Sequence, residues 1–340
     1  MIPCRMEEQN TNIQLSLNAQ DQIQGLFFKP YKSQKKAAKA PDGVKEREVE
    51  LQIADGKKLS GRLTTPAEGK SFPLVILLAG SGPNDMDETI YDNKPFQDIA
   101  WGLAKKGIAS YRYDKRTYTY PESFTVKDTV EQEVIFDAVA AFSQMKQQKQ
   151  IDTNKIYILG HSLSGYLIPR IAAETDGCAG YIMMAAPARA LDELLMEQVT
   201  YLAKLDGNIT KDEQAAIDQY KQDQQDLQRI DELSDAKIFF GGMSKAYMKD
   251  LLSYDAVQQA ADIKVPVLCA QGLRDYQVTE EDQAIWRKNF ETHKNWKFTT
   301  YPNATHLMID GEGTPTNEEY KTKGHVNQAF IEDIASFIKK

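Results

Sequence analysis

Residues 160–165 read GHSLSG and hold two serines, either of which could act as a nucleophile. The nucleophile-elbow pattern G-x-S-x-G fits Ser162 if Ser164 replaces the second glycine. An elbow is a sharp turn from strand to helix, and it needs small residues two places before and two places after the nucleophile. With Ser164 as nucleophile, the bulky Tyr166 would occupy the second of these places. We therefore favour Ser162, although so short a match also arises by chance.

A serine hydroxyl needs a histidine to take its proton and an acid to orient that histidine. In one large class of serine hydrolases these residues follow the serine in the order acid, then histidine. Asp275 and His306 each come directly after a strand-like run, in that order. Asp275 could instead be a helix cap or turn residue, and His325 and His293 compete with His306. Neither competitor directly follows a strand, so we predict the triad Ser162, Asp275 and His306.

Acyl transfer also needs two backbone amides that stabilise the negative charge on the carbonyl oxygen. The amide of Leu163 follows the nucleophile, and the loop GSGP after the first central strand offers a second at Ser81, with Gly82 beside it. This loop could alternatively open a dinucleotide fingerprint. However, Asp85 stands where the third glycine belongs, Pro83 interrupts the turn, and no GK[ST] follows. We therefore expect an oxyanion hole and no cofactor.

The elements that must position these residues alternate regularly from residue 47 onward. Strand-like runs and helical periodicity follow one another, which predicts an α/β fold with a mostly parallel sheet and helices on both faces. The expected strands cover residues 73–80, 108–114, 155–160, 180–187, 265–272 and 296–302, and the expected helices lie near 95–106, 127–147, 163 onward, 279–290 and 325 onward. Between residues 188 and 262 the alternation is replaced by three helical stretches, which we interpret as an all-helical cap over the strand ends.

The chain before residue 47 lacks this alternation of strands and helices. NIQLSLNAQDQIQGLFFKP alternates like two strands around a turn, and residues 32–46 are lysine-rich like a linker. We predict a strand-rich extension and linker at 1–46, possible remnants of an accessory domain, and a catalytic domain at 47–340. That domain should open with a hairpin that turns at Asp55-Gly56.

Composition excludes several classes of function. The chain has 340 residues and a formal net charge of −8, which disfavours nucleic acids and anionic membranes as partners. No apolar run approaches the roughly 20 residues that span a bilayer. The N-terminus resembles no signal peptide, so we expect a cytoplasmic protein. Three cysteines and four histidines show no metal-binding spacing, so we expect no metal. No pattern indicates an oligomeric state.

Several separate blocks resemble a bacterial family of α/β-hydrolase esterases, known variously as serine aminopeptidase-like or dienelactone hydrolase-like. The resemblance covers roughly residues 47–338. The matching blocks are GSGPNDMD (80–87), NKPF (93–96), RYDKR (112–116), GHSL (160–163), RDYQV (274–278) and GHV (324–326).

This resemblance implies a serine carboxylesterase with a helical cap, in which Ser162 is the nucleophile, Asp275 the acid and His306 the base. Two residues depart from the family pattern. Ser164 replaces the usual glycine, and Met86 replaces a common arginine, which we expect to alter the entrance of the site. The family's Asp114-Lys115-Arg116 cluster fits ion pairs that fix a loop better than it fits substrate contact.

These patterns lead us to expect hydrolysis of small carboxylic esters through an acyl-enzyme. The same triad could cleave amides, peptides or thioesters, and the chain could also be a binding protein without turnover. Gly82 and His161 are expected near the substrate. In the cap, Met243, Tyr247 and Met248 are candidate apolar walls, or otherwise ordinary core residues.

Overall fold

The computed structural model describes residues 2–5, 10–17, 23–30 and 39–339, and it divides the chain into two units, Met1–Lys39 and Ala40–Lys340. The first unit contains an antiparallel sheet in the order β1-β2-β3. Its strands are β1 (Ile2–Arg5), β2 (Asn10–Leu17) and β3 (Ile23–Pro30). Strands β2 and β3 were expected from the alternation, whereas β1 was not. The predicted turn between β2 and β3 and most of the predicted linker fall outside the described residues.

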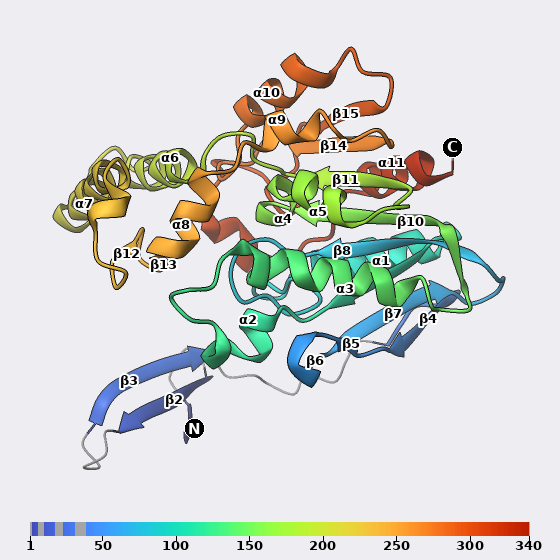
Figure 1. Cartoon of the computed structure of the whole chain (residues 1–340), viewed down its shortest axis with the longest axis horizontal. Helices are drawn as coiled ribbons and strands as arrows, with labels where there is room; N and C mark the ends of the chain where they lie inside the picture. Colours follow the sequence, from blue (N-terminus) through green and yellow to red (C-terminus); the bar gives the residue numbers. More distant parts are fainter. Residues whose placement is uncertain (1, 6–9, 18–22, 31–38, 340) are drawn as a thin grey trace. The chain divides into compact units, whose positions relative to one another are not determined.

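The second unit is built on an eight-stranded sheet in the order β15-β14-β11-β10-β8-β9-β7-β4 (Figure 1). Its strands are β4 (Val44–Glu48), β7 (Gly61–Pro66), β8 (Phe72–Leu78), β9 (Ala109–Tyr113), β10 (Ile151–His161), β11 (Gly180–Met184), β14 (Val267–Gly272) and β15 (Trp296–Tyr301). The six strands from β15 to β9 pair in parallel, and β7 and β4 add an antiparallel edge. Strand β4 begins at Val44, inside the segment predicted as linker.

The predicted hairpin near the start of this unit is present. The short strands β5 (Leu51–Gln52) and β6 (Lys58–Leu59) pair antiparallel on either side of a 3-10 turn at Ala54–Gly56, where Gly56 adopts a φ of 69°. The turn is therefore longer than the two-residue turn that Asp55-Gly56 suggests.

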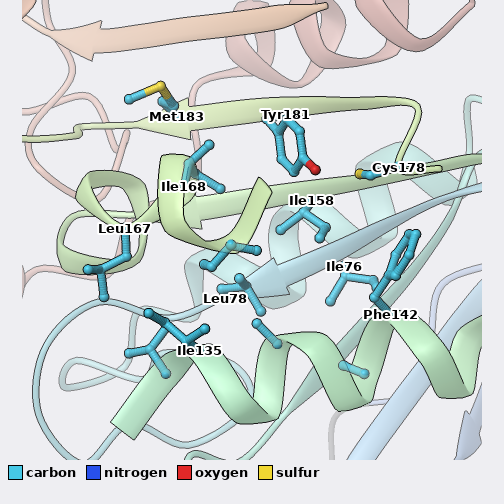
Figure 2. Packing of buried hydrophobic residues seen from close by; sticks show 14 of the residues in the cluster. Ile76, Leu78, Ile135, Phe142, Ile158, Leu167, Ile168, Cys178, Tyr181 and Met183 are labelled. Atoms are coloured by element: carbon cyan, nitrogen blue, oxygen red, sulfur yellow. The ribbon is translucent and has the colours of Figure 1, made fainter. Parts of the chain in front are cut away.

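Alternation along the central strands divides the core into two layers, because successive side chains of a strand point to opposite faces of the sheet. In β8, Leu74, Ile76 and Leu78 face one layer, and Val75 and Leu77 face the other. Figure 2 shows the first layer, where side chains from β8, β10 and β11 meet helices on that face. These runs are apolar on both faces, as buried parallel strands require.

Helices cover both layers. The helices of the second unit outside the cap region are α1 (Pro95–Ala104), α2 (Arg116–Thr119), α3 (Phe136–Met145), α4 (Leu163–Tyr166), α5 (Ile168–Glu174), α10 (Glu280–Phe290) and α11 (Gln328–Ile338). Buried residues of α1 and α11 join the layer of Val75 and Leu77, whereas those of α3 and α5 join the layer of Leu74. Within the described residues, no helix is long and apolar enough to cross a membrane.

The predicted cap lies between β11 and β14. It consists of α6 (Leu191–Ala203), α7 (Lys211–Leu227), α8 (Lys245–Leu252) and α9 (Ala256–Ala260). Thr210 and Glu213 form the predicted capping box of α7. The segment is not all-helical, because β12 (Ile238–Phe239) and β13 (Met243–Ser244) form a small antiparallel hairpin between α7 and α8. Strands of two residues are too short to leave an alternation in the sequence.

Candidate active site

Ser162 lies on the sharp turn between β10 and α4, as the elbow pattern predicts. Its φ and ψ are 51° and −118°, outside the regions that non-glycine residues commonly adopt. The surrounding sheet holds this conformation, since the Ser162 amide donates a hydrogen bond to the Met184 carbonyl of β11 at 2.9 Å. Strain of this kind is concentrated at functional sites.

The turn at Ser162 needs small residues two places before the nucleophile, as expected, but three places after it rather than two. A Cβ at Gly160 would collide with the backbone of Ser164, and one at Gly165 would lie 2.7 Å from the Ala186 Cβ. Ser164 is itself fully buried, and its hydroxyl donates to the Ala79 carbonyl at 2.5 Å. The crowded place after the nucleophile is therefore residue 165, and a serine is accommodated at residue 164 because its hydroxyl has an acceptor.

Asp275 and His306 come together at the ends of β14 and β15. The distance from His306 Nδ1 to Asp275 Oδ2 is 2.6 Å, and both residues are buried. The other carboxylate oxygen of Asp275 accepts hydrogen bonds from the amides of Gln277 and Val278. Asp275 is thus fixed on both sides and orients the His306 ring. The competing His325 is exposed and pairs with Asp98 instead.

The loop after β8 leaves one amide uncommitted. The amide of Gly80 donates to Glu88 at 2.7 Å, and that of Gly82 donates to Glu133 at 3.2 Å. The amide of Ser81, between them, takes part in no hydrogen bond among the described residues. Leu163 is the first residue of α4, where an amide has no acceptor within the helix. The two amides expected to form an oxyanion hole are therefore the ones available.

A cavity of about 680 Å³ connects these groups. Ser162 and His306 both line it, as do Ser81, Gly82 and Leu163. Among the hydrogen bonds of the described residues, none joins the Ser162 and His306 side chains directly. Such bonds are often long in unliganded enzymes. The cap contributes Met243 and Tyr247 to the walls, as expected.

Three predicted positions differ in the structure. Met248 does not line the cavity, because it packs with Phe239 and Phe240 in a separate apolar cluster of the cap. His161 lies behind the nucleophile, where Glu88 and the His306 backbone bind its ring. Met86 also lies away from the lining, and its amide donates to Asp114.

Glu133, which no local motif marks, connects three parts of the site: the loop after β8, Lys115 after β9, and Tyr247 in the cap. One carboxylate oxygen accepts from Lys115 Nζ at 2.6 Å and from the Gly82 amide, and the other accepts from the Tyr247 hydroxyl at 2.6 Å. Lys115 Nζ also donates to the Gly80 carbonyl at 2.7 Å. Burial and the nearby carboxylate raise the pKa of Tyr247, so its hydroxyl stays protonated and donates.

The rest of the Asp114-Lys115-Arg116 cluster also forms fixed contacts. Arg116 forms a bidentate ion pair with Asp137 of α3, and Asp114 accepts a hydrogen bond from the Met86 amide. The prediction that this cluster fixes a loop through ion pairs is confirmed. The described residues contain no group of three or more His, Cys, Asp or Glu side chains that could hold a metal ion.

Comparison with known proteins points to one family. Residues 93–313 match the family model described as serine aminopeptidase S33 (Hydrolase_4). Esterase EstD of Thermotoga maritima is 39% identical over 328 residues, which are 96% of this chain and 76% of EstD. The structure of Est1E from Butyrivibrio proteoclasticus matches with a TM-score of 0.54 at 18% identity, covering 86% of this chain and 96% of Est1E. Esterase Pf2001 of Pyrococcus furiosus also gives 0.54, at 17% identity over 87% of this chain and 90% of its own.

At such low sequence identities the two solved structures establish the fold alone. The family model and the 39% identity to EstD establish membership of the family. The predicted α/β fold and the resemblance to α/β-hydrolase esterases are confirmed. The elbow at Ser162, the Asp275–His306 pair and the shared cavity thus occur in a chain that belongs to the serine aminopeptidase S33 family of α/β-hydrolases.

Proposed function

We propose that this protein hydrolyses uncharged carboxylic esters through an acyl-enzyme formed on Ser162. The observation that carries the proposal is the shared cavity. It is lined both by Ser162, on its strained turn, and by His306, whose ring is held by Asp275 at 2.6 Å. The 39% identity to esterase EstD supports the same class of reaction.

In the proposed mechanism, His306 takes the hydroxyl proton of Ser162 as its oxygen attacks the ester carbonyl. The carbonyl oxygen gains negative charge, which the amides of Ser81 and Leu163 stabilise by hydrogen bonds. His306 then gives its proton to the departing alcohol, and the acyl group stays on Ser162. Water, deprotonated by His306, attacks this ester and releases the acid. Asp275 stabilises the charged imidazolium in both halves.

Charge in the cavity favours neutral substrates. Glu133 and Arg189 line it, but Glu133 is paired with Lys115, and Arg189 is paired with Asp282 at 2.8 Å. An aminopeptidase must bind the ammonium group of its substrate, usually through an uncommitted carboxylate. Since the carboxylate of Glu133 already pairs with a lysine, cleavage of a free N-terminal residue is disfavoured.

The walls favour an apolar acyl or alcohol group. Leu191, Leu194 and Leu195 of α6 line the cavity together with Met243 and the Tyr247 ring. Contact with such side chains contributes roughly 25 cal/mol per Å² of apolar surface removed from water. Small neutral esters and thioesters fit this surface. The cytoplasmic location and the absence of a nucleic-acid or membrane partner stay predictions.

Labelling by a fluorophosphonate tests the nucleophile. We expect Ser162→Ala to abolish labelling and to lower kcat on p-nitrophenyl acetate by at least roughly 10³-fold. Ser164→Ala is the matched control. It should label and turn over like the wild type, while loss of its hydrogen bond to Ala79 lowers the free energy of unfolding by about 1 kcal/mol. A Ser162→Ala protein that still labels at Ser164 would overturn the assignment.

A panel of matched substrates then tests the substrate class. Neutral esters should be cleaved well. An ester with a carboxylate on its acyl chain and a p-nitroanilide with a free ammonium group should be poor substrates. Preference for the ammonium-bearing anilide would contradict an esterase, and absence of both labelling and turnover in the wild type would indicate a binding protein.

A further inference from the structure

A second acid–imidazole pair lies behind the nucleophile, outside the cavity. Glu88 and His161 are each about 2% exposed. The distance from His161 Nδ1 to Glu88 Oε1 is 2.8 Å, and His161 Nε2 lies 2.9 Å from the backbone carbonyl oxygen of His306. Both ring nitrogens therefore face acceptors. Only the doubly protonated ring can donate to both.

The surroundings favour that charged form. Burial alone would lower the pKa of His161, but the Glu88 carboxylate and the His306 carbonyl together raise it above its usual value. The Asp275 carboxylate, farther away, acts in the same direction. Neither Glu88 nor His161 is among the residues that line the cavity. Direct contact with a substrate therefore does not explain the charge on His161.

Glu88 also binds the loop that leads into the oxyanion hole. The oxygen that accepts from His161 accepts from the Gly80 amide at 2.7 Å. Glu88 itself has a φ of 53°, in the left-handed region that a glutamate rarely adopts. Strain of this kind persists where the surrounding structure fixes it, commonly at functional sites.

We propose that Glu88 and His161 are a positioning pair that holds three segments in one arrangement: the oxyanion loop (residues 80–82), the nucleophile elbow (residues 160–165) and the loop that carries His306. Gly80 immediately precedes Ser81, and His161 immediately precedes Ser162, so each contact is one residue from a reacting group. The third contact, from His161 Nε2, reaches the backbone carbonyl of the proposed base His306 itself. The inference rests on the proposed function, since it assigns a role in aligning that site.

A loss of stability alone would not identify the pair as a positioning pair. A buried ion pair often stabilises a fold no more than apolar residues of similar volume would. Displacement of a catalytic group by about 1 Å, by contrast, can cost roughly 100-fold in rate. A role in alignment therefore predicts a loss of turnover in the molecules that remain folded, in addition to any loss of stability.

Glu88→Gln tests this with almost no change in volume. The amide oxygen can still accept from Gly80, but without the carboxylate charge His161 becomes neutral and can donate from only one nitrogen. We expect kcat, counted per site titrated with fluorophosphonate, to fall about 10- to 100-fold while KM changes less than about twofold. His161→Gln should have a similar effect, and the double variant should lose little more than either single variant because the two residues act as a unit.

His325→Gln is the matched control. It removes an exposed histidine that pairs with Asp98 at 3.1 Å, and its kcat per titrated site should equal that of the wild type. The proposal is overturned if Glu88→Gln and His161→Gln lower only the melting temperature or the number of titratable sites, with kcat per site unchanged. A wild type that neither labels nor turns over would instead refute the proposed function itself.

Discussion

Single side chains determine how the turn at Ser162 is built. The Ser164 hydroxyl links the start of α4 to the Ala79 carbonyl at the end of β8, and Gly165 lets the same helix approach Ala186. Exchange of Ser164 for glycine would remove one hydrogen bond, whereas a side chain at Gly165 would push the helix away from the sheet. The departure at residue 164 is therefore compatible with a working elbow.

His161 should also make stability depend on pH. Its pKa is raised above its usual value of 6.5, because Glu88 and the His306 carbonyl outweigh the effect of burial. The stabilisation is therefore complete below about pH 6.5 and is lost as pH rises through the higher folded-state pKa, with a slope of at most about 1.4 kcal/mol per pH unit. We expect the difference in unfolding free energy between wild type and His161→Gln, measured by urea denaturation, to shrink from pH 6.5 to 9. A difference that grows over this range would contradict the assignment.

At the scale of elements, the cap and the sheet domain meet at the Tyr247 hydroxyl of α8 and Glu133. Glu133 lies in the π-helical turn Glu131–Ile135 that precedes α3, and such turns are frequent at functional sites. The same carboxylate binds the Gly82 amide, so the cap contact and the oxyanion loop share one side chain.

Tyr247→Phe should destabilise the protein more than a comparable loss elsewhere. A hydrogen bond to a charged acceptor typically contributes about 1.5–3 kcal/mol, whereas one to a neutral acceptor contributes about 1 kcal/mol. The matched control is Tyr254→Phe, since the Tyr254 hydroxyl donates to the neutral Tyr166 carbonyl at 3.0 Å. Unfolding free energies should therefore fall further for Tyr247→Phe. Equal losses would show that the contact between the cap and Glu133 adds nothing beyond a neutral bond.

The elements that sequence reasoning found are those with a strong local pattern. The alternating strands and helices, the elbow and the capping box of α7 each depend on neighbours in the chain, so spacing alone indicates them. Glu88 and Glu133 are single carboxylates whose partners His161 and Tyr247 lie 73 and 114 residues away, and no spacing marks such pairs. The prediction for Met248 was wrong because it packs against Phe239, which belongs to a hairpin too short to predict.

At the scale of the whole molecule, each residue that the structure describes at the candidate site belongs to the second unit. Among the described residues, those that line the cavity fall between Ser81 and His306, and the eight-stranded sheet ends in β4, which starts at Val44.

Removal of residues 1–39 should therefore leave the reaction intact. The remaining chain keeps β4, both layers of the core and every group of the proposed mechanism. We expect kcat/KM on p-nitrophenyl acetate to stay within about twofold of the full chain, because no group that touches the transition state is lost. A control that also removes β4 should unfold more readily, since it exposes the edge of β7 and removes the buried Val44 side chain. If the first truncation folds, labels with fluorophosphonate and yet loses more than about tenfold in kcat/KM, the first unit takes part in catalysis or substrate binding, and the site extends beyond the second unit.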